Sequence, residues 1–228
     1  MKLSVIMPTY NEERTIKTIV KRVFDVPLDI ELIVVDDCSQ DKTRDILTAL
    51  SKRYKIKKVY QKSNQGKGAA IRAGIKHATG DMVIIQDADL EYDPQDYVRM
   101  VKPISDGKAE VVYGSRFLDK SHYKDQKKLF YLGNKFLTVL SNILYGTKIT
   151  DEATCYKLFS AKAIKKVKLR CKRFEFCPEV TAKVSKLGYR IVEVPIHYHP
   201  RSTEEGKKIR LYDGVDAVWT LIKYRFIK

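Results

Sequence analysis

The sequence contains no apolar run close to the roughly 20 residues that a membrane-crossing helix needs. The apolar stretch near its N-terminus, residues 3–7, is also too short for the core of a signal peptide and is typical of a first strand. These two absences argue against a membrane-spanning chain and against a secreted one.

Cysteine-based metal and redox motifs are absent as well. The four cysteines show no C-x-x-C spacing, so neither a structural zinc site nor a thioredoxin-like motif is predicted. His197 and His199 would share one face of a strand without a third ligand nearby, and we interpret the pair as structural or phosphate-facing. Reduced side chains that serve packing are expected at Cys38, Cys155, Cys171 and Cys177.

Positive charge, by contrast, is abundant. Lysine and arginine number 44 against 28 acidic residues, which gives a formal charge of +16 and a pI of about 9.6. Such a chain is expected to meet nucleic acid, a phosphorylated ligand or an acidic membrane surface. Its basic residues are spread along the sequence, and no helix-turn-helix, RNP or zinc-finger pattern occurs. We therefore expect no specific nucleic-acid partner.

The first 115 residues alternate between strand and helix patterns. Apolar residues at helical spacing indicate a helix over 12–24, and a glycine-containing turn leads into another over 66–78. Short apolar runs predict strands at 3–7, 30–35, 56–60, 82–85 and 111–113. This order predicts an α/β fold with a mostly parallel, Rossmann-like sheet flanked by helices.

The second half departs from that alternation within one predicted domain, residues 1–228. A charged loop is predicted at 200–209. Helices are predicted at 129–145, 178–187 and 213–226, and strands at about 156–159 and 190–198.

Acidic residues follow two of the predicted buried strands. Asp36 and Asp37 come after the second strand, and Asp87 and Asp89 come after the fourth. Ligands of open α/β sheets bind at these carboxyl ends, and residues two apart in an extended chain can point to one side. Two converging carboxylates suit Mg²⁺ or Mn²⁺ beside a phosphate. The alternative is a strand end and turn without a ligand.

A glycine-containing turn at 64–68 leads into the helix that is predicted to follow the third strand. Its backbone N–H groups are expected to approach an anion, the alternative being a plain helix-entry turn. The turn is neither G-x-G-x-x-G nor a Walker A motif, so dinucleotide binding and NTP hydrolysis are not favoured. A nucleotidyltransferase is also disfavoured, because residues 9–12 are not a glycine-rich activation loop.

Several short motifs occur in the order seen in inverting glycosyltransferases of family 2. They are Pro8-Thr9-Tyr10-Asn11-Glu12, Val35-Asp36-Asp37-Cys38-Ser39, Asn64-Gln65-Gly66-Lys67-Gly68, Asp87-Ala88-Asp89 and Gly114-Ser115-Arg116. Residues 150–157 and 200–208 resemble the dolichyl-phosphate mannose synthase-like branch. The resemblance covers nearly the whole chain and implies a GT-A fold, a nucleotide-sugar donor and a divalent metal, Mg²⁺ or Mn²⁺.

The resemblance also implies roles for individual residues. Asp37 would contact the base, and Glu91 stands where the mannose synthases often carry a glutamine that completes the metal shell. The implied metal ligands are Asp87, Asp89 and Glu91. The implied donor-binding residues are Pro8, Tyr10, Glu12, Asp37, Lys67, Asp87, Ala88, Asp89 and Lys207.

The acceptor decides which residues must take part in acid–base chemistry. A sugar hydroxyl needs a general base, whereas a lipid phosphate is already an anion and needs positive charge to hold it. The resemblance puts Arg116 and Arg201 near an acceptor phosphate, and it puts Asp151 or Glu152 where relatives with hydroxyl acceptors carry their base. The predicted catalytic residues are Asp89, Asp151, Arg116 and Arg201.

We therefore predict a metal-dependent, inverting transfer of a hexose, mannose or glucose, from a GDP- or UDP-sugar to a polyprenyl or dolichyl phosphate. Residues 1–115 would bind the nucleotide sugar, and residues 116–228 the acceptor. The alternative keeps the donor but transfers the sugar to a sugar or protein hydroxyl, with Asp151 as the base.

The region 129–145 bears on the membrane. Lysines precede it and apolar residues cover much of its circumference, which predicts an interfacial helix, the alternative being a helix packed on the sheet. The loop 200–209 is predicted to be a mobile lid. We expect a cytoplasmic protein, peripheral to the membrane, with a separate membrane-anchor subunit as a candidate partner.

Overall fold

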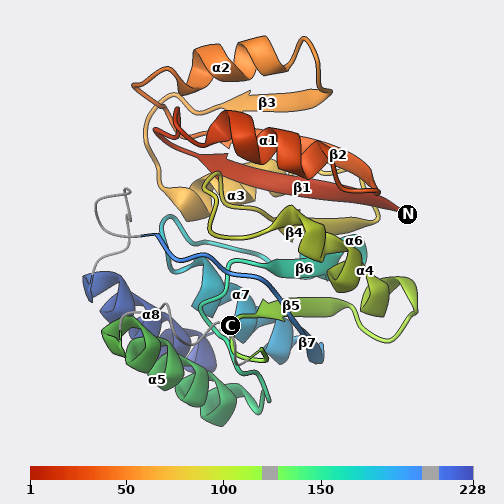
Figure 1. Ribbon diagram of the computed structural model, residues 1–228. Coiled ribbons are helices and arrows are strands. Elements are labelled where there is room, and N and C mark those ends of the chain that lie inside the picture. The colour runs from red at the N-terminus through yellow and green to blue at the C-terminus, as the bar shows by residue number, and fades with distance from the viewer. Residues whose placement is uncertain (120–127, 202–210, 228) are drawn as a thin grey trace.

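One seven-stranded sheet dominates the computed structural model, which describes residues 1–119, 128–201 and 211–227 (Figure 1). Its strand order is β3-β2-β1-β4-β6-β5-β7. The strands are β1 (Lys2–Thr9), β2 (Asp29–Asp36), β3 (Ile56–Tyr60), β4 (Met82–Ile85), β5 (Val111–Ser115), β6 (Lys157–Ser160) and β7 (Ile191–Pro195). Only β6 is antiparallel to its neighbours, so the mostly parallel sheet predicted from the sequence is confirmed.

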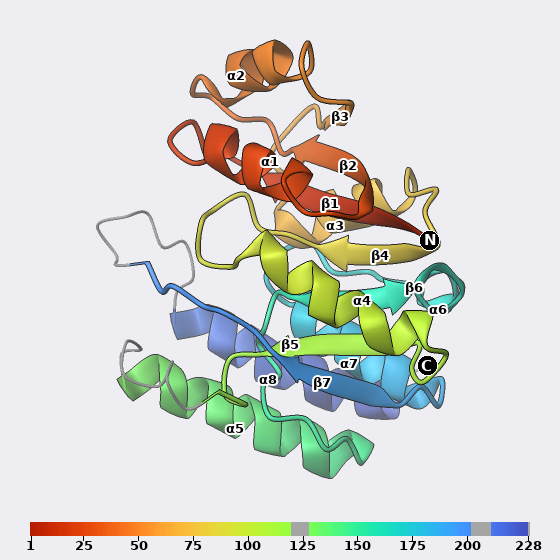
Figure 2. The ribbon, with the colours of Figure 1, turned by 45° about the vertical axis from the view of Figure 1, so that its right-hand side comes forward.

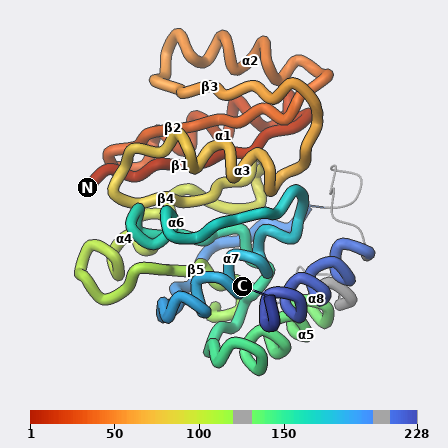
Figure 3. Tube along the Cα trace, turned by 180° about the vertical axis from the view of Figure 1, so that it is seen from behind, coloured from red at the N-terminus to blue at the C-terminus, as the bar shows by residue number. Residues whose placement is uncertain are grey.

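Helices cover both faces of the sheet (Figures 1 and 3). One face carries α1 (Ile16–Phe24), α2 (Thr43–Leu50), the 3-10 turn η1 (Pro94–Asp96) and α4 (Tyr97–Ser105). The other carries α3 (Lys67–Ile75), α6 (Ala161–Lys166) and α7 (Phe176–Lys186). Two further helices, α5 (Lys128–Tyr145) and α8 (Leu211–Phe226), pack beside α7 and each other.

The two hydrophobic cores follow from the alternation of strand side chains. On β1, Val5 belongs to the core under α1 and α4, while its neighbour Ile6 belongs to the core under α3 and α7. Ile84 and Ile85 of β4 divide in the same way. Strands buried on both faces explain the continuous apolar runs in the sequence.

Several helices and strands begin or end at residues other than those predicted from the sequence. The helix predicted from residue 12 begins at Ile16, because the N–H groups of Thr15 and Ile16 both donate to the carbonyl of Glu12 in a preceding turn. The strand predicted over 190–198 ends at Pro195, after which His197 N–H donates to Asp96 rather than to β5. The helix α4 was not predicted, and it contains Pro103, a residue that seldom lies inside a helix.

Strands of the two halves share the sheet. β6, from the second half, lies between β4 and β5 of the first half. Within the described residues, no helix is both long and apolar enough to cross a membrane.

Candidate active site

Most of the predicted site residues lie at one edge of the sheet, where β1, β2, β4 and β5 end, opposite the N label in Figure 1. Here an acidic cluster, defined as Glu12, Asp89 and Glu91, surrounds one arginine. Arg201 Nη2 lies 2.6 Å from Asp89, its Nη1 lies 3.7 Å from Glu12, and its Nε lies 3.9 Å from Glu91. The backbone N–H of Arg201 also donates to Glu91 at 2.8 Å. Arg201 thereby joins the chain after β7 to the ends of β1 and β4.

The acidic cluster carries more negative charge than Arg201 neutralises. Burial, together with repulsion from Asp87 and Glu91, raises the pKa of Asp89 to about 7, although Arg201 acts in the opposite direction. A cation arriving beside Asp89 would relieve this repulsion.

Asp87 has a different partner. Its carboxylate lies 2.6 Å from the ammonium group of Lys67, at the start of α3. Burial favours a neutral lysine, but the charge of Asp87 holds the pKa of Lys67 well above its usual range. Asp87 and Asp89 therefore each face a cationic side chain of the protein, Lys67 and Arg201 respectively.

The two carboxylates fit the implied metal in donor type. They are hard oxygen ligands, which Mg²⁺ and Mn²⁺ prefer. Among the described residues, no three side chains of His, Cys, Asp or Glu gather closely enough to hold a metal ion. Mg²⁺ usually takes only one or two carboxylates and completes its shell with water and substrate phosphates, so Asp87 and Asp89 suit that mode.

The turn at 64–68 corrects one expectation. The N–H groups of Gly68 and Ala69 donate to the carbonyls of Arg173 and Lys172, so these two amides are not directed at an anion, whereas those of Gln65 and Gly66 donate to the carboxylate of Asp37. The reason is a close approach: a Cβ at Gly68 would lie 2.9 Å from the Arg173 carbonyl oxygen. At this turn it is the Lys67 side chain that offers positive charge.

Asp37, which was predicted to contact the base, makes its hydrogen bonds within the protein. Its carboxylate accepts hydrogen bonds from Gln65 N–H at 2.8 Å and Gly66 N–H at 2.7 Å. Burial raises the pKa of Asp37 despite these bonds. The base-binding role stays a prediction, and the geometry gives Asp37 the task of holding the 64–66 turn.

The remaining donor-side residues flank this edge. Pro8 and Tyr10, both half-buried, stand at the end of β1, followed by Asn11 in a left-handed conformation with φ of 51°. Ala88 is buried, and its carbonyl accepts a hydrogen bond from Thr15 Oγ1 at 2.8 Å. Lys207 and most of the loop 200–209 lie outside the described residues.

A second charged pair lies beside the cluster. Arg116 makes a bidentate ion pair with Asp151, through Nε to Oδ2 and Nη2 to Oδ1, both at 2.7 Å. The Asp151 side chain is fully buried, and the Arg116 side chain is 11% exposed. Burial alone would raise the pKa of Asp151, but the charge of Arg116 and its hydrogen bonds lower it. The guanidinium also lies 5.0 Å from the ring centre of Tyr198.

Two residues that hold Asp151 were not predicted. Asn134 of α5 donates to Asp151 Oδ1 at 2.8 Å. Glu193 of β7 accepts hydrogen bonds from the N–H groups of Thr150 and Asp151, at 2.7 and 3.1 Å. Neither stands in a local motif, so only the tertiary contact reveals them.

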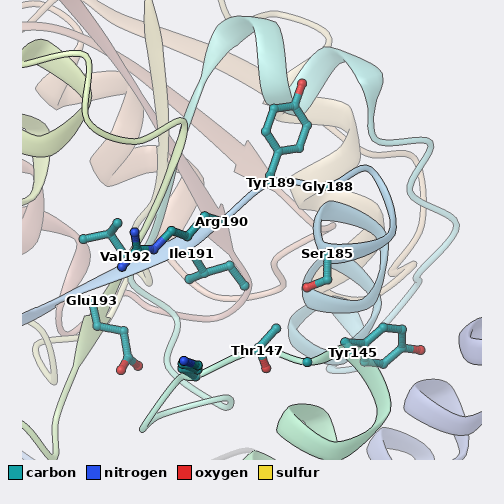
Figure 4. A pocket seen from close by; sticks show the side chains of 11 residues that line it. Tyr145, Thr147, Ser185, Gly188, Tyr189, Arg190, Ile191, Val192 and Glu193 are labelled. Carbon is teal, nitrogen blue, oxygen red and sulfur yellow. The ribbon is translucent and has the colours of Figure 1, made fainter.

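Glu193 also lines a hollow of about 650 Å³ that contains none of the predicted site residues (Figure 4). Tyr145 of α5 and Ser185 of α7 lie on its other side (Figure 4). Through Glu193 this hollow borders the segment that carries Asp151.

Helix α5 has an inverted distribution of side chains. Asn134, Thr138 and Ser141 are buried, whereas Phe136 and Ile143 are 59% and 74% exposed. α8, which lies beside α5 at the β7 side of the sheet (Figures 1 and 2), exposes apolar residues too. The exposed apolar residues of both helices, here called the apolar face, are Leu132, Phe136, Val139, Ile143, Val215, Trp219, Ile222 and Phe226.

Comparison with known sequences gives consistent results. The profile of "Glycosyl transferase family 2" matches residues 4–168. A UDP-N-acetylglucosamine–dolichyl-phosphate N-acetylglucosaminyltransferase of Methanococcus voltae is 31% identical, with 84% of this chain and 83% of that protein covered. A dolichol-phosphate mannosyltransferase of Pyrococcus furiosus is 28% identical, covering 91% and 59%. A dolichyl-phosphate beta-glucosyltransferase of Trichomonas vaginalis is 29% identical, covering 97% and 72%.

Solved structures agree on the fold. Glucosyl-3-phosphoglycerate synthase of Mycobacterium tuberculosis, in complex with Mn²⁺, UDP and phosphoglyceric acid, superposes with a TM-score of 0.74 at 20% identity, covering 100% of this chain and 79% of that one. A mannosyltransferase of Pyrobaculum calidifontis, in complex with GDP-mannose and Mn²⁺, gives 0.62 at 21% identity, covering 85% and 54%. The predicted GT-A fold is confirmed.

Proposed function

Because this chain belongs to glycosyl transferase family 2, we propose that it transfers a hexose from a nucleoside-diphosphate sugar to dolichyl or polyprenyl phosphate. Three relatives are named for transfer to dolichyl phosphate, with N-acetylglucosamine, mannose and glucose as their sugars. Their common element is the lipid phosphate, which supports the acceptor class. Mannose or glucose, carried on GDP or UDP, is the proposed donor.

The observation that carries the proposal is the charge at the acceptor side. Arg116 and Arg201 are both largely buried beside the acidic cluster. Arg201 Nε, moreover, is buried without a hydrogen-bond acceptor among the described residues. A phosphate oxygen is the kind of group that would satisfy it, because guanidinium N–H groups match phosphate geometry.

The same geometry weighs against a hydroxyl acceptor. A general base needs a carboxylate that can take a proton. Asp151 already accepts hydrogen bonds from Arg116 and Asn134, and its pKa is lowered. We assign Asp151 the task of orienting Arg116.

In the proposed reaction, a phosphate oxygen of the acceptor attacks the anomeric carbon opposite the leaving diphosphate, so that the configuration inverts. Asp87 and Asp89 would hold the divalent metal, which when bound would supply Lewis acidity that neutralises the leaving group. Lys67 faces the same diphosphate. Arg201, which lies 2.6 Å from Asp89, would offset the repulsion between the acceptor phosphate and the leaving diphosphate while the bond between sugar and nucleotide breaks.

The apolar face supports action at a membrane surface. A helix whose buried side is polar and whose exposed side is apolar suits the boundary between water and acyl chains. We propose that the apolar face rests on the bilayer that contains the lipid phosphate, on its cytoplasmic side.

The test is sugar transfer to lipid. With Mn²⁺ and polyprenyl phosphate present, labelled GDP-mannose or UDP-glucose should yield a chloroform-soluble product. Asp89→Asn should reduce turnover on the order of 10² to 10³-fold, because leaving-group charge is then poorly stabilised. Asp106→Asn, at an exposed ion pair with Lys108, is the matched control and should retain activity. A folded protein that labels no lipid from either donor would overturn the proposal.

A further inference from the structure

Gln86 carries a fully buried amide and stands in the chain between the end of β4 and the two predicted metal ligands. Its backbone N–H donates to the Ile6 carbonyl at 2.9 Å and so continues the pairing of β4 with β1 by one residue. A buried side-chain amide is costly unless it is hydrogen-bonded. The groups that bind this amide therefore indicate what it does in the protein.

Two tyrosines hold the oxygen of the Gln86 amide. The hydroxyl of Tyr156, just before β6, donates to Gln86 Oε1 at 2.6 Å, and the hydroxyl of Tyr97, the first residue of α4, donates to the same oxygen. Both tyrosines are fully buried, with ring centres 5.7 Å apart. The amide oxygen is thus held from two parts of the fold at once.

The nitrogen of the same amide holds the backbone of the first predicted ligand. Gln86 Nε2 donates to the carbonyl of Asp87 at 3.0 Å. If the amide were turned over, its oxygen would face this carbonyl oxygen, and two acceptors would repel each other. The network therefore permits one orientation of Gln86, and through it α4 and the chain before β6 support the backbone at Asp87.

Two peptide planes lie between the Cα atoms of Asp87 and Asp89, and a side chain holds the carbonyl of each. Gln86 holds the Asp87 carbonyl. The Thr15 hydroxyl donates to the Ala88 carbonyl at 2.8 Å. Because a peptide group is planar, a fixed carbonyl also fixes the orientation of its peptide plane. These two contacts therefore set the directions in which Asp87 and Asp89 leave the backbone.

We propose that Gln86 is a positioning residue for the divalent metal, because it fixes the backbone from which Asp87 and Asp89 would present their carboxylates to the ion. Its own amide is occupied by the two tyrosines and the Asp87 carbonyl, so Gln86 acts through Asp87 and not as a ligand. This inference rests on the proposed function, which makes the two carboxylates the metal ligands. Groups that support metal ligands by hydrogen bonds are typically worth about 10- to 100-fold in metal affinity or activity.

The experiment measures metal binding apart from sugar transfer. The full chain is dialysed to equilibrium against Mn²⁺ with GDP or UDP present on both sides, and the excess of Mn²⁺ on the protein side is the bound ion. Gln86→Met, which keeps an unbranched side chain and removes the amide, should weaken Mn²⁺ binding by about 10- to 100-fold. In the transfer assay, the loss of turnover in this variant should become smaller as the Mn²⁺ concentration is raised.

Tyr113→Phe is the matched control for the loss of a buried hydrogen bond. Tyr113 is fully buried in the core on the other face of the sheet, where its hydroxyl lies 2.8 Å from Thr181 Oγ1. Both variants should lower the free energy of unfolding in urea, but only Gln86→Met should lower the affinity for Mn²⁺. Tyr97→Phe, which leaves the amide oxygen one tyrosine donor, should weaken Mn²⁺ binding less than Gln86→Met does.

The possible results separate this role from the proposed function. Wild-type Mn²⁺ affinity in a folded Gln86→Met chain overturns the role, and so do equal losses in Gln86→Met and Tyr113→Phe. A wild-type chain that binds no Mn²⁺ with either nucleotide refutes the metal site and this role with it. A chain that shows the expected Mn²⁺ affinities but labels no lipid refutes the proposed acceptor and leaves the role of Gln86 standing.

A second variant covers the case in which Gln86→Met does not fold. The double variant Tyr97→Phe with Tyr156→Phe keeps the amide but removes both hydroxyl donors from its oxygen. It should weaken Mn²⁺ binding more than Tyr97→Phe alone, and an unchanged affinity would overturn the role of Gln86.

Discussion

Asp151 is an ionised carboxylate with no exposure to water, which is stable only because other groups replace its hydration. Arg116 supplies three N–H groups, from Nε, Nη2 and its backbone, together with a full charge, and Asn134 supplies a fourth donor. Glu193 fixes the backbone on which Asp151 stands. At this position stability and the orientation of Arg116 depend on the same contacts.

Replacing Asp151 should therefore affect stability before it affects chemistry. Asp151→Asn leaves the Arg116 charge buried without its partner, which typically costs about 3 to 5 kcal/mol. Urea unfolding should show this loss, and Asp106→Asn should change the free energy of unfolding by less than about 1 kcal/mol. In the double variant with Arg116→Met, part of the loss should return. An unchanged midpoint for Asp151→Asn would contradict this account.

Some of these residues could be predicted from the sequence, and others could not. Asp87 and Asp89 were predicted because they come shortly after a buried strand, and Arg116 was predicted from a motif that resembles family 2 glycosyltransferases. The hydrogen bonds that hold Asp37, and those that Asn134 and Glu193 make to Asp151, join residues 17 to 42 positions apart in the sequence. Such contacts have no local spacing, so only the folded chain reveals them.

Among the elements, α3 packs unusually close to the sheet. Gly74, inside α3, is buried, and a Cβ there would lie 2.4 Å from Ile6 Cγ2 and 3.1 Å from Val35 Cγ2. Apart from its own helix, Gly133, inside α5, has no atom of another described residue within 4 Å of the same position. The two glycines are thus matched in secondary structure and opposite in packing.

Replacing glycine by alanine should change the free energy of unfolding in opposite directions at these two positions. Gly133→Ala should raise the free energy of unfolding by about 0.5 to 1 kcal/mol, since alanine is the better helix former. Gly74→Ala should lower it by about 1 to 3 kcal/mol, because overpacking forces α3 from β1. Thermal unfolding measures both. If both variants changed the free energy of unfolding equally and in the same direction, helix propensity rather than packing would determine the effect.

Glu31 ties β2 to the turn before β4. Burial opposes ionisation, but hydrogen bonds from Ser4 and Thr79, with the charge of Lys2, lower the pKa of Glu31 from 4.5 to about 2. The unfolded chain thus takes up a proton at Glu31 at higher pH than the folded chain does. Stability from this group is complete above about pH 5 and falls as the pH decreases toward 2.

Glu31→Gln should remove that part of the pH dependence. Unfolding by urea at several pH values between about 2 and 6 measures it, and the variant's curve should be flatter than the wild type's. Asp25→Asn, on an exposed carboxylate at the end of α1, is the control. If Glu31→Gln leaves the slope unchanged, Glu31 does not carry it.

The boundaries of elements were the least predictable feature. The helix after β1 starts late because Glu12 forms a turn, and β7 stops at Pro195 because the chain turns toward Asp96. The inserted β6 was predicted as a strand from its apolar residues. Its antiparallel place between β4 and β5 was not, because a four-residue run carries no information on its neighbours.

For the molecule as a whole, we expect the apolar face to determine how the protein is oriented on a membrane surface. Ile143 and Trp219 are 74% and 62% exposed on α5 and α8. Burying each of these side chains in lipid contributes about 1.5 to 3 kcal/mol. Ile143→Ser or Trp219→Ser should therefore weaken partition onto vesicles roughly 10- to 100-fold.

Sedimentation with vesicles that contain anionic lipid, at fixed salt, measures the partition. Val98→Ser is the control, because Val98 is 45% exposed on α4, on the other side of the sheet. An equal loss for Val98→Ser would show that the apolar face has no special part in binding.

The position of β6 has a consequence for synthesis on the ribosome. β4 and β5 are connected in the sheet through β6, which can pair with both of them only after residues 157–160 have emerged. A nascent chain of about 115 residues therefore displays one edge of β4 and both edges of β5 without their partner strands, and such edges invite pairing with other chains. We expect residues 1–115 to complete their folding only after residues 157–160 are available. Neither half should therefore fold or function when it is expressed alone.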